Sequence, residues 1–494
     1  MAITIDLLEL PTPFLEFGGV GQFTDPKIGL RDAGPYDMRF GTARISSINI
    51  GLVGPPEMVA NARQWLKRCL APMQSLMNNT AQYPDFPGFE SVFRVPLKTN
   101  KKWEAEVDAD ALQKALAKAP QAAFEDALTL YEAGMKKISK LENARPNVII
   151  CCLPDNLRNR CGSIENKAIK DRKKAKEEAK KVIQLDLFAP APEVEQTEDD
   201  LLRRDFRRAL KARAMYLEVP IQLGSNRLFV DQPKGQDAAT RAWNSCIALY
   251  YKAGGVPWRL RSEGPETCFV GISFFHIYTK RDHLVRSCIA QAFSSEGEGF
   301  AIRGANIPWD DKQGLNVHLS YEQARDLGDK ILERYQERTG IAPMRVVVHK
   351  TSVFNAEEAD GLRSALSNVA IVELINLAST NFRLTRFDPY PPKRGTLCTL
   401  NSSRYYLFTT GYMPELKTYP GPHIPAPMEI KSDENVEASI ERIAGDVLGL
   451  AKMNWNTGSV TGGYPVTLSF SRMVGGIMAE FKGDEPPASF RYYI

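Results

Sequence analysis

The chain has 494 residues, of which 43% are hydrophobic and 25% charged, so it can bury a sizeable core and is not a disordered protein. Its formal net charge of +4 permits a polyanionic partner but does not argue for one. The sequence shows no basic, apolar leader and no run of about 18 uncharged apolar residues, which predicts a cytoplasmic protein without a membrane segment.

Strands and helices alternate after a proline- and glycine-rich start. Residues 1–42 predict an irregular N-terminal arm that packs on another surface. The following segments predict a strand at 43–54, a helix at 58–71, a strand at 91–97, a helix at 124–141 and a fully apolar strand at 146–154. Such an apolar run is typical of a strand buried in a parallel sheet, so the pattern indicates a Rossmann-like α/β layer.

Two segments of unusual composition lie in the middle of the chain. Residues 167–181 are dense in both charges and predict a solvated helix, with a nucleic-acid contact as the less favoured interpretation. Residues 185–200 are acidic and proline-rich and predict a surface loop. The later segments predict helices at 201–217, 238–253 and 321–340 and strands at 219–223, 267–278 and 344–350, with a domain boundary near residue 260.

Four polar residues around the helix at 201–217 could converge on a phosphate group. Arg207 and Lys211 are four positions apart and therefore share a helical face. Gln222 follows on the next strand, and Lys252 ends the next helix just before two glycines. A terminal phosphate has nearly two negative charges and three acceptor oxygens near pH 7, which suits converging cations and an amide. The spacing alone is weak evidence, because many ordinary helices carry basic pairs four apart.

A resemblance to the MID domain of Argonaute proteins rests on the run KAGGVPW at 252–258 together with Arg207, Lys211 and Gln222. In that family, residues at these places hold the 5′-phosphate of a short guide, so the resemblance implies this role for Arg207, Lys211, Gln222 and Lys252. The loop at 153–156 occupies the place of the family's loop that senses the first guide base. In many relatives Mg²⁺ bridges the guide phosphates, the glutamine and the C-terminal carboxylate, which implies Gln222 and Ile494 here.

The second α/β unit resembles a PIWI domain, whose fold is RNase H-like. The segments at 268–275, 346–355 and 454–478 carry this resemblance. Active PIWI domains cleave the target with two Mg²⁺ ions held by clustered carboxylates. The positions of the two aspartates are Ser273 and Thr351, and the position of the last ligand is Arg472. Because two hydroxyls and a cation cannot hold a pair of divalent ions, we expect no cleavage activity.

The resemblance covers most of residues 43–494 and implies an α/β protein with a MID domain at 43–260 and a PIWI domain at 261–494, behind the arm at 1–42, without N or PAZ domains. In lacking N and PAZ domains, the expected protein resembles short prokaryotic Argonautes. These use short 5′-phosphorylated guide RNA to detect single-stranded target DNA from plasmids or phages, and they activate an APAZ-domain effector protein. The effector is a SIR2 or TIR NADase or a nuclease, and the arm would suit docking on such a partner.

Two other classes of function stay open. An active guided nuclease would need acids from elsewhere, such as Asp310, Asp311 or Glu298. A Rossmann-type metabolic enzyme would need a glycine-rich phosphate turn, but GLVGPP at 51–56 lacks the third glycine and has prolines where the helix should open. The five histidines suggest no catalytic triad, and the eight cysteines, without a Cys-x-x-Cys pair, predict buried thiols rather than zinc ligands.

Overall fold

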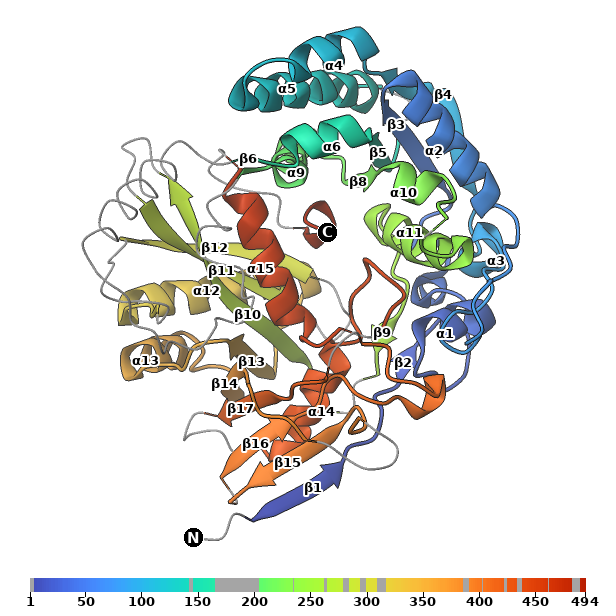
Figure 1. Ribbon diagram of the computed structural model, residues 1–494. Helices are drawn as coiled ribbons and strands as arrows, with labels where there is room; N and C mark the ends of the chain where they lie inside the picture. Colours follow the sequence, from blue (N-terminus) through green and yellow to red (C-terminus); the bar gives the residue numbers. More distant parts are fainter. Residues whose placement is uncertain are drawn as a thin grey trace, which may run out of the picture.

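The structure is a computed structural model of the chain in which a small parallel sheet and a large mixed sheet, each covered by helices, lie side by side (Figure 1). It describes residues 4–141, 145–164, 204–233, 235–261, 264–278, 284–293, 299–308, 317–384, 391–401, 403–421, 424–432, 438–460, 462–481 and 489–494. None of the described helices is long and apolar enough to cross a membrane.

Four parallel strands form the smaller sheet, in the order β4-β3-β5-β8. They are β3 (Ile48–Gly54), β4 (Leu97–Glu106), β5 (Val148–Cys152) and β8 (Ile221–Gly224). Every residue of β5 is buried, as its uninterrupted apolar sequence predicts. The α/β layer expected from the alternation of strands and helices is confirmed.

Helices cover both faces of the smaller sheet, as its alternating pattern requires. On one face, α2 (Pro56–Cys69) packs against β3 and α11 (Ala238–Lys252) against β8, in the same hydrophobic cluster as Ile50. On the other, α5 (Pro120–Ser139) and α9 (Phe206–Met215) pack in the same cluster as Val53. Short elements complete this half: α3 (Phe89–Phe93), α4 (Ala109–Leu116), α6 (Asp155–Cys161), α10 (Asn226–Phe229), β6 (Ser163–Ile164) and β7 (Arg204–Asp205).

Nine strands form the larger sheet, in the order β1-β15-β16-β17-β14-β13-β10-β11-β12. Its centre is parallel: β10 (Thr267–Tyr278), β13 (Arg345–Lys350) and β14 (Ile371–Ser379) run in one direction. The flanking strands pair antiparallel, and they are β11 (Leu284–Phe293), β12 (Gly299–Pro308), β15 (Thr396–Leu400), β16 (Arg404–Leu407) and β17 (Met428–Ser432).

Two pairs of helices enclose the larger sheet (Figure 1). On one face lie α12 (Tyr321–Thr339), which begins with a capping box of Ser320 and Gln323, and α13 (Ala356–Ala365). On the other face lie α14 (Ile440–Leu450) and α15 (Val466–Met478). α15 approaches β10 so closely that a Cβ on Gly271 would stand 2.0 Å from the carbonyl oxygen of Thr467. Only glycine fits at this crossing.

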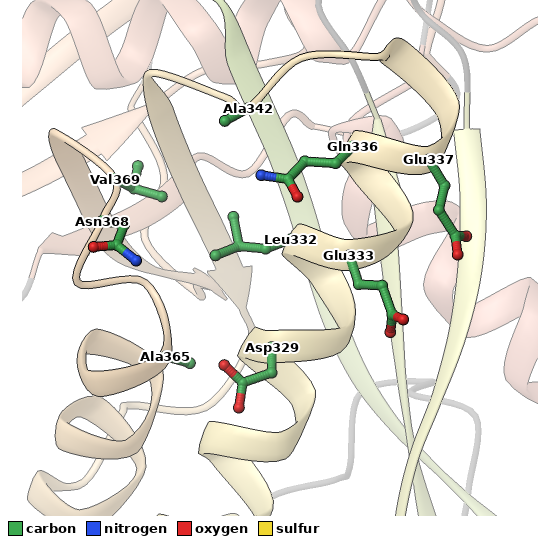
Figure 2. Close-up of a pocket in the computed structure, with 9 residues that line it drawn as sticks. All are labelled: Asp329, Leu332, Glu333, Gln336, Glu337, Ala342, Ala365, Asn368 and Val369. Atoms are coloured by element: carbon green, nitrogen blue, oxygen red, sulfur yellow. The ribbon is translucent and has the colours of Figure 1, made fainter.

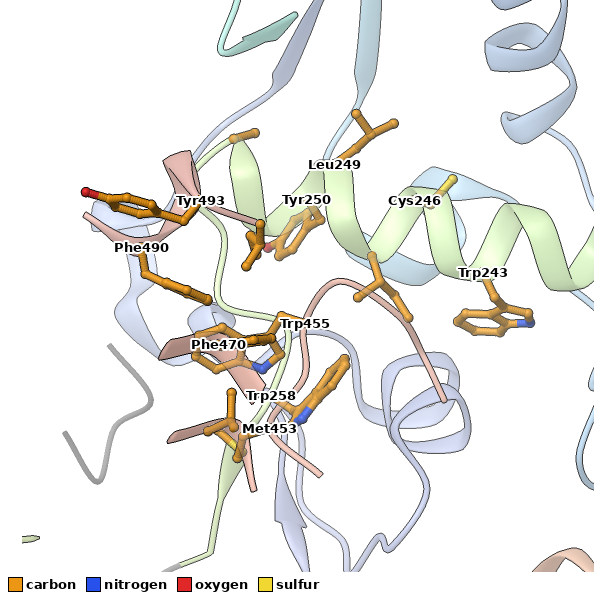
Figure 3. Packing of buried hydrophobic residues seen from close by; sticks show 14 of the residues in the cluster. Trp243, Cys246, Leu249, Tyr250, Trp258, Met453, Trp455, Phe470, Phe490 and Tyr493 are labelled. Atoms are coloured by element: carbon orange, nitrogen blue, oxygen red, sulfur yellow. The ribbon is translucent and has the colours of Figure 1, made fainter. Parts of the chain in front are cut away.

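One hydrophobic core is shared between the two halves of the molecule. Figure 3 shows Trp243 and Tyr250 of α11 beside residues from the last tenth of the chain, among them Trp455 and Phe470. The rings of Phe470 and Phe490 lie 4.4 Å apart, centroid to centroid. The C-terminal segment, including η3 (Phe490–Tyr492), is therefore part of the contact between the halves rather than a free tail.

The N-terminal arm packs on this chain and is more regular than its sequence predicts, so the expectation of an irregular arm was wrong. It contains β1 (Ile5–Glu9), β2 (Leu15–Glu16), α1 (Pro26–Ala33) and the 3₁₀ segment η1 (Tyr36–Ala43). β1 pairs with β15, and β2 pairs with β9 (Arg259–Leu260). The prolines and glycines mark the ends of these short elements: Asp25 caps α1 before Pro26, and Gly34 ends it with a φ of 68°.

The strand predicted at 91–97 is a second error. Phe89, Val92 and Phe93 are buried at helical spacing in α3, which ends at Arg94 in a left-handed conformation with φ 56°. β4 begins only at Leu97. The short helix was missed because an apolar run of this length has no clear period.

The remaining predictions concern the charged segments, the helix at 201–217 and the cysteines. The predicted charged helix at 167–181, the loop at 185–200 and the three acids Glu298, Asp310 and Asp311 lie outside the described residues. The helix expected at 201–217 is described as α9, from Phe206 to Met215. The seven described cysteines are free and buried, as predicted.

Candidate nucleic-acid interface

Helix α9 presents two of the four predicted phosphate-binding residues. Asp205 caps the helix by accepting a hydrogen bond from the backbone N–H of Arg208, 3.0 Å away. Phe206 and Leu210 are buried in the core of the smaller sheet, which fixes the orientation of the helix. Arg207 is exposed and Lys211 is half-buried, one turn apart on the opposite side.

Gln222 and Lys252, thirty positions apart in the sequence, are in direct contact. Gln222 lies on β8, and Lys252 is the last residue of α11, with only 1% of its surface exposed. The Lys252 ammonium donates hydrogen bonds to the Gln222 side-chain oxygen and, over 3.0 Å, to the carbonyl oxygen of Ile221. The described contacts of this buried lysine are to neutral oxygens and include no counter-ion, which is unusual in a protein interior.

The two glycines after Lys252 have separate structural reasons. Gly254 has φ 104°, a conformation that favours glycine and ends the helix. A Cβ on Gly255 would stand 2.3 Å from the ring of Tyr250, so a larger residue would displace that side chain. Tyr250 in turn donates to the Asp37 carboxylate, 2.7 Å from both oxygens. The motif therefore fixes the path of the backbone directly after the buried lysine.

The C-terminal residues complete the cluster. The Lys211 ammonium donates to the carbonyl oxygen of Tyr493 over 3.0 Å. Tyr493 and Ile494 are 0% and 1% exposed, and Figure 3 shows Tyr493 near Tyr250 of α11. The last two residues of the chain are therefore buried, and the carbonyl group of Tyr493 lies against the ammonium of Lys211.

Electrostatics agree with a crowded positive cluster. Burial, reinforced by the charge of Arg207, lowers the pKa of Lys211 to about 7, although Asp205 opposes the effect. Burial lowers the pKa of Lys252 well below its ordinary value, and the charges of Lys211 and Arg207 lower it further. Each positive charge makes protonation of the neighbouring lysine less favourable. The cluster would therefore be stabilised by a bound anion.

Arg491 is a residue that sequence reasoning missed. Its guanidinium lies beside the Gly254 turn, where a Cβ would stand 3.3 Å from one terminal nitrogen. Its Nε is buried and has no hydrogen-bond partner. Sequence spacing gave no signal for this residue, because η3 reaches α11 only through the tertiary fold.

The loop predicted to sense the first guide base lies at the carboxyl end of the smaller sheet. The N–H of Leu153 donates to the carbonyl of Gly224 over 2.7 Å, which fixes the start of the loop beside the end of β8. Pro154 then precedes α6, so Asp155 and Asn156 occupy the first turn of that helix. The segment is thus a strand-to-helix connection rather than a long loop.

The three positions aligned with PIWI ligands lie on β10, after β13 and on α15. Ile272 of β10 pairs with Lys350, the last residue of β13, in parallel register. Ser273 and Thr351 directly follow these two paired residues. Arg472 is exposed on α15, and its guanidinium lies 5.1 Å from the centroid of the Tyr464 ring. No described contact joins Arg472 to either of the other two.

No cluster of carboxylates is described at the carboxyl ends of β10 and β13. Among the described residues, no group of three or more His, Cys, Asp or Glu side chains could hold a metal ion. The Glu358 carboxylate is fully buried and forms an ion pair with the Lys350 ammonium. Ser273 Oγ is buried without a hydrogen-bond partner. The ends of β10 and β13 therefore offer hydroxyl groups at the two aligned positions, Ser273 and Thr351.

A groove between α12 and α13 is of a different kind. Figure 2 shows Leu332 and Gln336 of α12 directed toward the segment that follows α13. Its lining includes three carboxylates and no cation: Asp329, Leu332, Glu333, Gln336, Glu337, Ala342, Ala365, Asn368 and Val369. The carboxylates would repel a polyanion, so we exclude this groove from the nucleic-acid interface.

The fold of the whole chain is similar to that of known proteins. No protein-family model matches the sequence, and no curated protein matches it. The solved structures that it resembles include Clostridium butyricum Argonaute bound to a guide DNA and a 19-mer target DNA, with a TM-score of 0.60 and 13% identity. Another is Aa-Ago with externally bound siRNA, with a TM-score of 0.58 and 14% identity.

The alignments cover 98% of this chain but 54% and 56% of those two chains, so it spans about half the length of these Argonautes. At this level of identity the comparison establishes the architecture. The chain has an Argonaute-like α/β fold.

Proposed function

We propose that this protein binds the 5′-phosphate of a short guide and recognises a nucleic-acid target without cutting it. The observation that carries the proposal is the cluster around half-buried Lys211 and buried Lys252, which has cations and an amide. Among the residues that the structure describes, no carboxylate side chain contacts either ammonium. A dianionic phosphate would replace the neutral carbonyl and amide oxygens that these ammonium groups now contact, and would offset their mutual repulsion.

We further propose that the bound guide end includes Mg²⁺. Gln222 and the C-terminal carboxylate of Ile494 would supply oxygen ligands of the kind that Mg²⁺ prefers, with guide phosphates supplying others. The fit is partial, because the Gln222 oxygen already accepts a hydrogen bond from Lys252. Gln222 would have to release Lys252 as the phosphate draws the ammonium toward itself.

The absence of cutting rests on residue chemistry. Ser273 and Thr351 are neutral, and Arg472 is a cation that would repel Mg²⁺. Hydrolysis with two metal ions needs carboxylates at the carboxyl ends of these strands. We therefore propose a non-enzymatic role for this chain, in which pairing between guide and target carries sequence specificity and biases a conformational change.

The proposal extends to the biological role implied by the resemblance. The guide would be a short 5′-phosphorylated RNA, the target a single-stranded DNA, and the output would come from an APAZ-domain effector protein with NADase or nuclease activity. Such a system would act against plasmids or phages. The fold that the chain shares with an Argonaute bound to guide and target DNA supports the nucleic-acid part of this role.

The phosphate pocket is tested with the double variant Lys211→Ala/Lys252→Ala. We expect it to weaken binding of a 5′-phosphorylated RNA about 100-fold, since two charge-assisted contacts are lost, and to change binding of the same RNA with a 5′-hydroxyl little. The matched control is Lys114→Ala/Lys118→Ala, an exposed pair with the same spacing on and just after α4. Equal losses for both guides would refute the pocket.

Cleavage is tested with a matched guide and a labelled target strand in the presence of Mg²⁺ or Mn²⁺. We expect stable ternary complexes on a native gel and intact target on a denaturing gel. Target cut at one position opposite the guide would contradict the proposal and would return the chain to the class of active guided nucleases.

A further inference from the structure

The edge strand β1 is unusually open for a strand of a large sheet. All five of its residues are exposed, and three of them are large aliphatic residues: Ile5, Leu7 and Leu8, at 50%, 60% and 44%. Ile5 and Leu7 lie on one face of the strand and Leu8 on the other, because side chains alternate. Apolar surface is therefore exposed on both faces of β1. The strand lies at the outer edge of the larger sheet (Figure 1).

The backbone of β1 is paired on one side only. The N–H of Leu10 donates to Gly395, and the N–H of Asn401 donates to Thr4, which fixes the antiparallel register with β15. In that register the even-numbered residues exchange hydrogen bonds with β15. The N–H and C=O groups of Ile5, Leu7 and Glu9 therefore point to the outer edge, where no described strand meets them.

The strand at the opposite edge of the larger sheet, β12, is covered by other elements. β12 contacts α12 and η3, and Phe300 forms a bridge with Ser489. Proteins normally protect an open edge with lysine, proline or a bulge, because an unprotected apolar edge recruits other strands. β1 has none of these devices, and its charged residues are the two acids Asp6 and Glu9.

We propose that the outer edge of β1 is a docking site for an extended segment of a partner protein, which would add a strand to the larger sheet. Backbone hydrogen bonds to Ile5, Leu7 and Glu9 would give the register, and aliphatic residues would cover Ile5, Leu7 and Leu8. This inference takes from the proposed function only the existence of a partner protein and does not depend on the guide pocket.

Charge identifies the segment further. Glu9 already forms an ion pair with Lys393, 2.7 Å apart, whereas Asp6 has no ion pair among the described residues. The docking segment should therefore carry a lysine or arginine opposite Asp6. A second copy of this chain does not provide one. Antiparallel overlap of two β1 strands over their full length would set Asp6 against Leu8, and a shift by two residues would set the two Asp6 side chains against each other.

The test uses the full chain and a fluorescent eight-residue peptide of valines with one lysine placed to face Asp6. We expect binding by anisotropy, with slowed hydrogen exchange at the amides of Ile5, Leu7 and Glu9. The same peptide, N-methylated at the amides that would face β1, should bind at least about tenfold more weakly, because it cannot complete the ladder. Equal binding of the two peptides, or unchanged exchange at the three amides, would overturn the proposal.

The variant Leu7→Pro removes one outward N–H without removing a hydrogen bond to β15, and proline is tolerated on the open side of an edge strand. It should weaken the peptide about tenfold, whereas Ile341→Lys, at an aliphatic residue that is 53% exposed elsewhere, should not. The N-methylated peptide keeps the test decisive if the proline variant does not fold. A dimer of the wild type that Leu7→Pro abolishes would assign the edge to a second copy and refute the partner.

Guide binding is measured on the same samples. Leu7→Pro should bind 5′-phosphorylated RNA as the wild type does, since β1 lies in the larger sheet and no described contact joins it to α9 or α11. Failure of the wild type to bind any guide would reject the proposed function and leave the peptide result standing, so the two outcomes are separable.

Discussion

The ammonium of Lys211 donates a hydrogen bond to the carbonyl oxygen of Tyr493, joining residues 282 positions apart. Through this bond the last turn of the chain is tied to α9, the helix that also carries Arg207. The candidate guide pocket is therefore built from two distant parts of the sequence, and a change in either should affect it.

The affinity for a 5′-phosphorylated guide should fall as pH rises above about 7. The pKa of Lys211 is lowered to about 7, so above this pH the free pocket is increasingly neutral and must take up a proton to hold the phosphate. We expect a loss of up to about tenfold per pH unit between pH 7.5 and 9, measured by filter binding. Lys211→Arg, which stays protonated, should bind with little pH dependence over the same range, and a pH-independent wild type would contradict the assignment.

The same lowered pKa predicts a trend in stability. Between pH 7 and the ordinary lysine pKa of 10.5, the unfolded chain binds a proton at this residue that the folded chain does not. Stability of the guide-free protein should therefore gain a contribution from Lys211 as pH rises through this window. Denaturant titrations of the wild type and of Lys211→Met at pH 7.5 and 9 measure it, and the difference between the two proteins should change with pH in this direction.

Removal of divalent cations should weaken guide binding. If Mg²⁺ joins the guide phosphates to Gln222 and Ile494, chelation with EDTA should reduce affinity for a 5′-phosphorylated RNA by about tenfold or more, and Mg²⁺ should restore it. Gln222→Leu should bind as weakly without EDTA as the wild type binds with it. An affinity that does not respond to EDTA would eliminate the metal and leave the cation cluster as the whole site.

Gly271→Ala should destabilise the fold strongly. The new Cβ would collide with the backbone of Thr467, and neither β10 nor α15 can move without disturbing the core between them. We expect a loss of about 3 kcal/mol in the free energy of unfolding. Gly445→Ala in α14 is the matched control: its Cβ would meet nothing within 4 Å, and it should stabilise the protein by about 0.5–1 kcal/mol. Similar effects of both changes would show that the crossing is looser than described.

Lys452 should anchor the N-terminal arm. Its buried ammonium donates to the carbonyl oxygens of Pro13 and Thr24, 2.8 and 2.9 Å away, on the two sides of β2. Lys452→Met should leave both carbonyls unsatisfied, cost about 2 kcal/mol and make the arm more sensitive to limited proteolysis. Lys330→Met, which breaks an exposed ion pair with Asp326 on α12, should cost less than about 0.5 kcal/mol. Equal protease sensitivity of both variants would reject the anchor.

Much of the fold could be predicted because local patterns were long or unambiguous. β5 is apolar at every position, and α12 has a capping box and a glycine at its end, so their types follow from the sequence alone. The arm could not be predicted, because β1 is strand only through its pairing with β15. Its own five residues have no alternation that marks a buried face.

The candidate site likewise combines local features that the sequence predicts with distant contacts that it does not. The spacing of Arg207 and Lys211 follows from helical geometry, and the two glycines after Lys252 mark the end of a helix. The contact between Lys252 and Gln222 was only implied by resemblance, because it joins residues on different elements. Arg491 gave no sequence signal, since its position beside Gly254 depends on the path of the whole chain.

The pairing of β1 with β15 also delays the formation of the larger sheet during synthesis. Thr4 is hydrogen-bonded to Asn401, 397 positions later. At about 5–20 residues per second, the ribosome needs roughly 20–80 s to deliver the partner of the first strand. Throughout that time the aliphatic strand β1 has no sheet to join. The protein should therefore depend on chaperones early in translation, and slower synthesis at lower temperature should not by itself improve its yield.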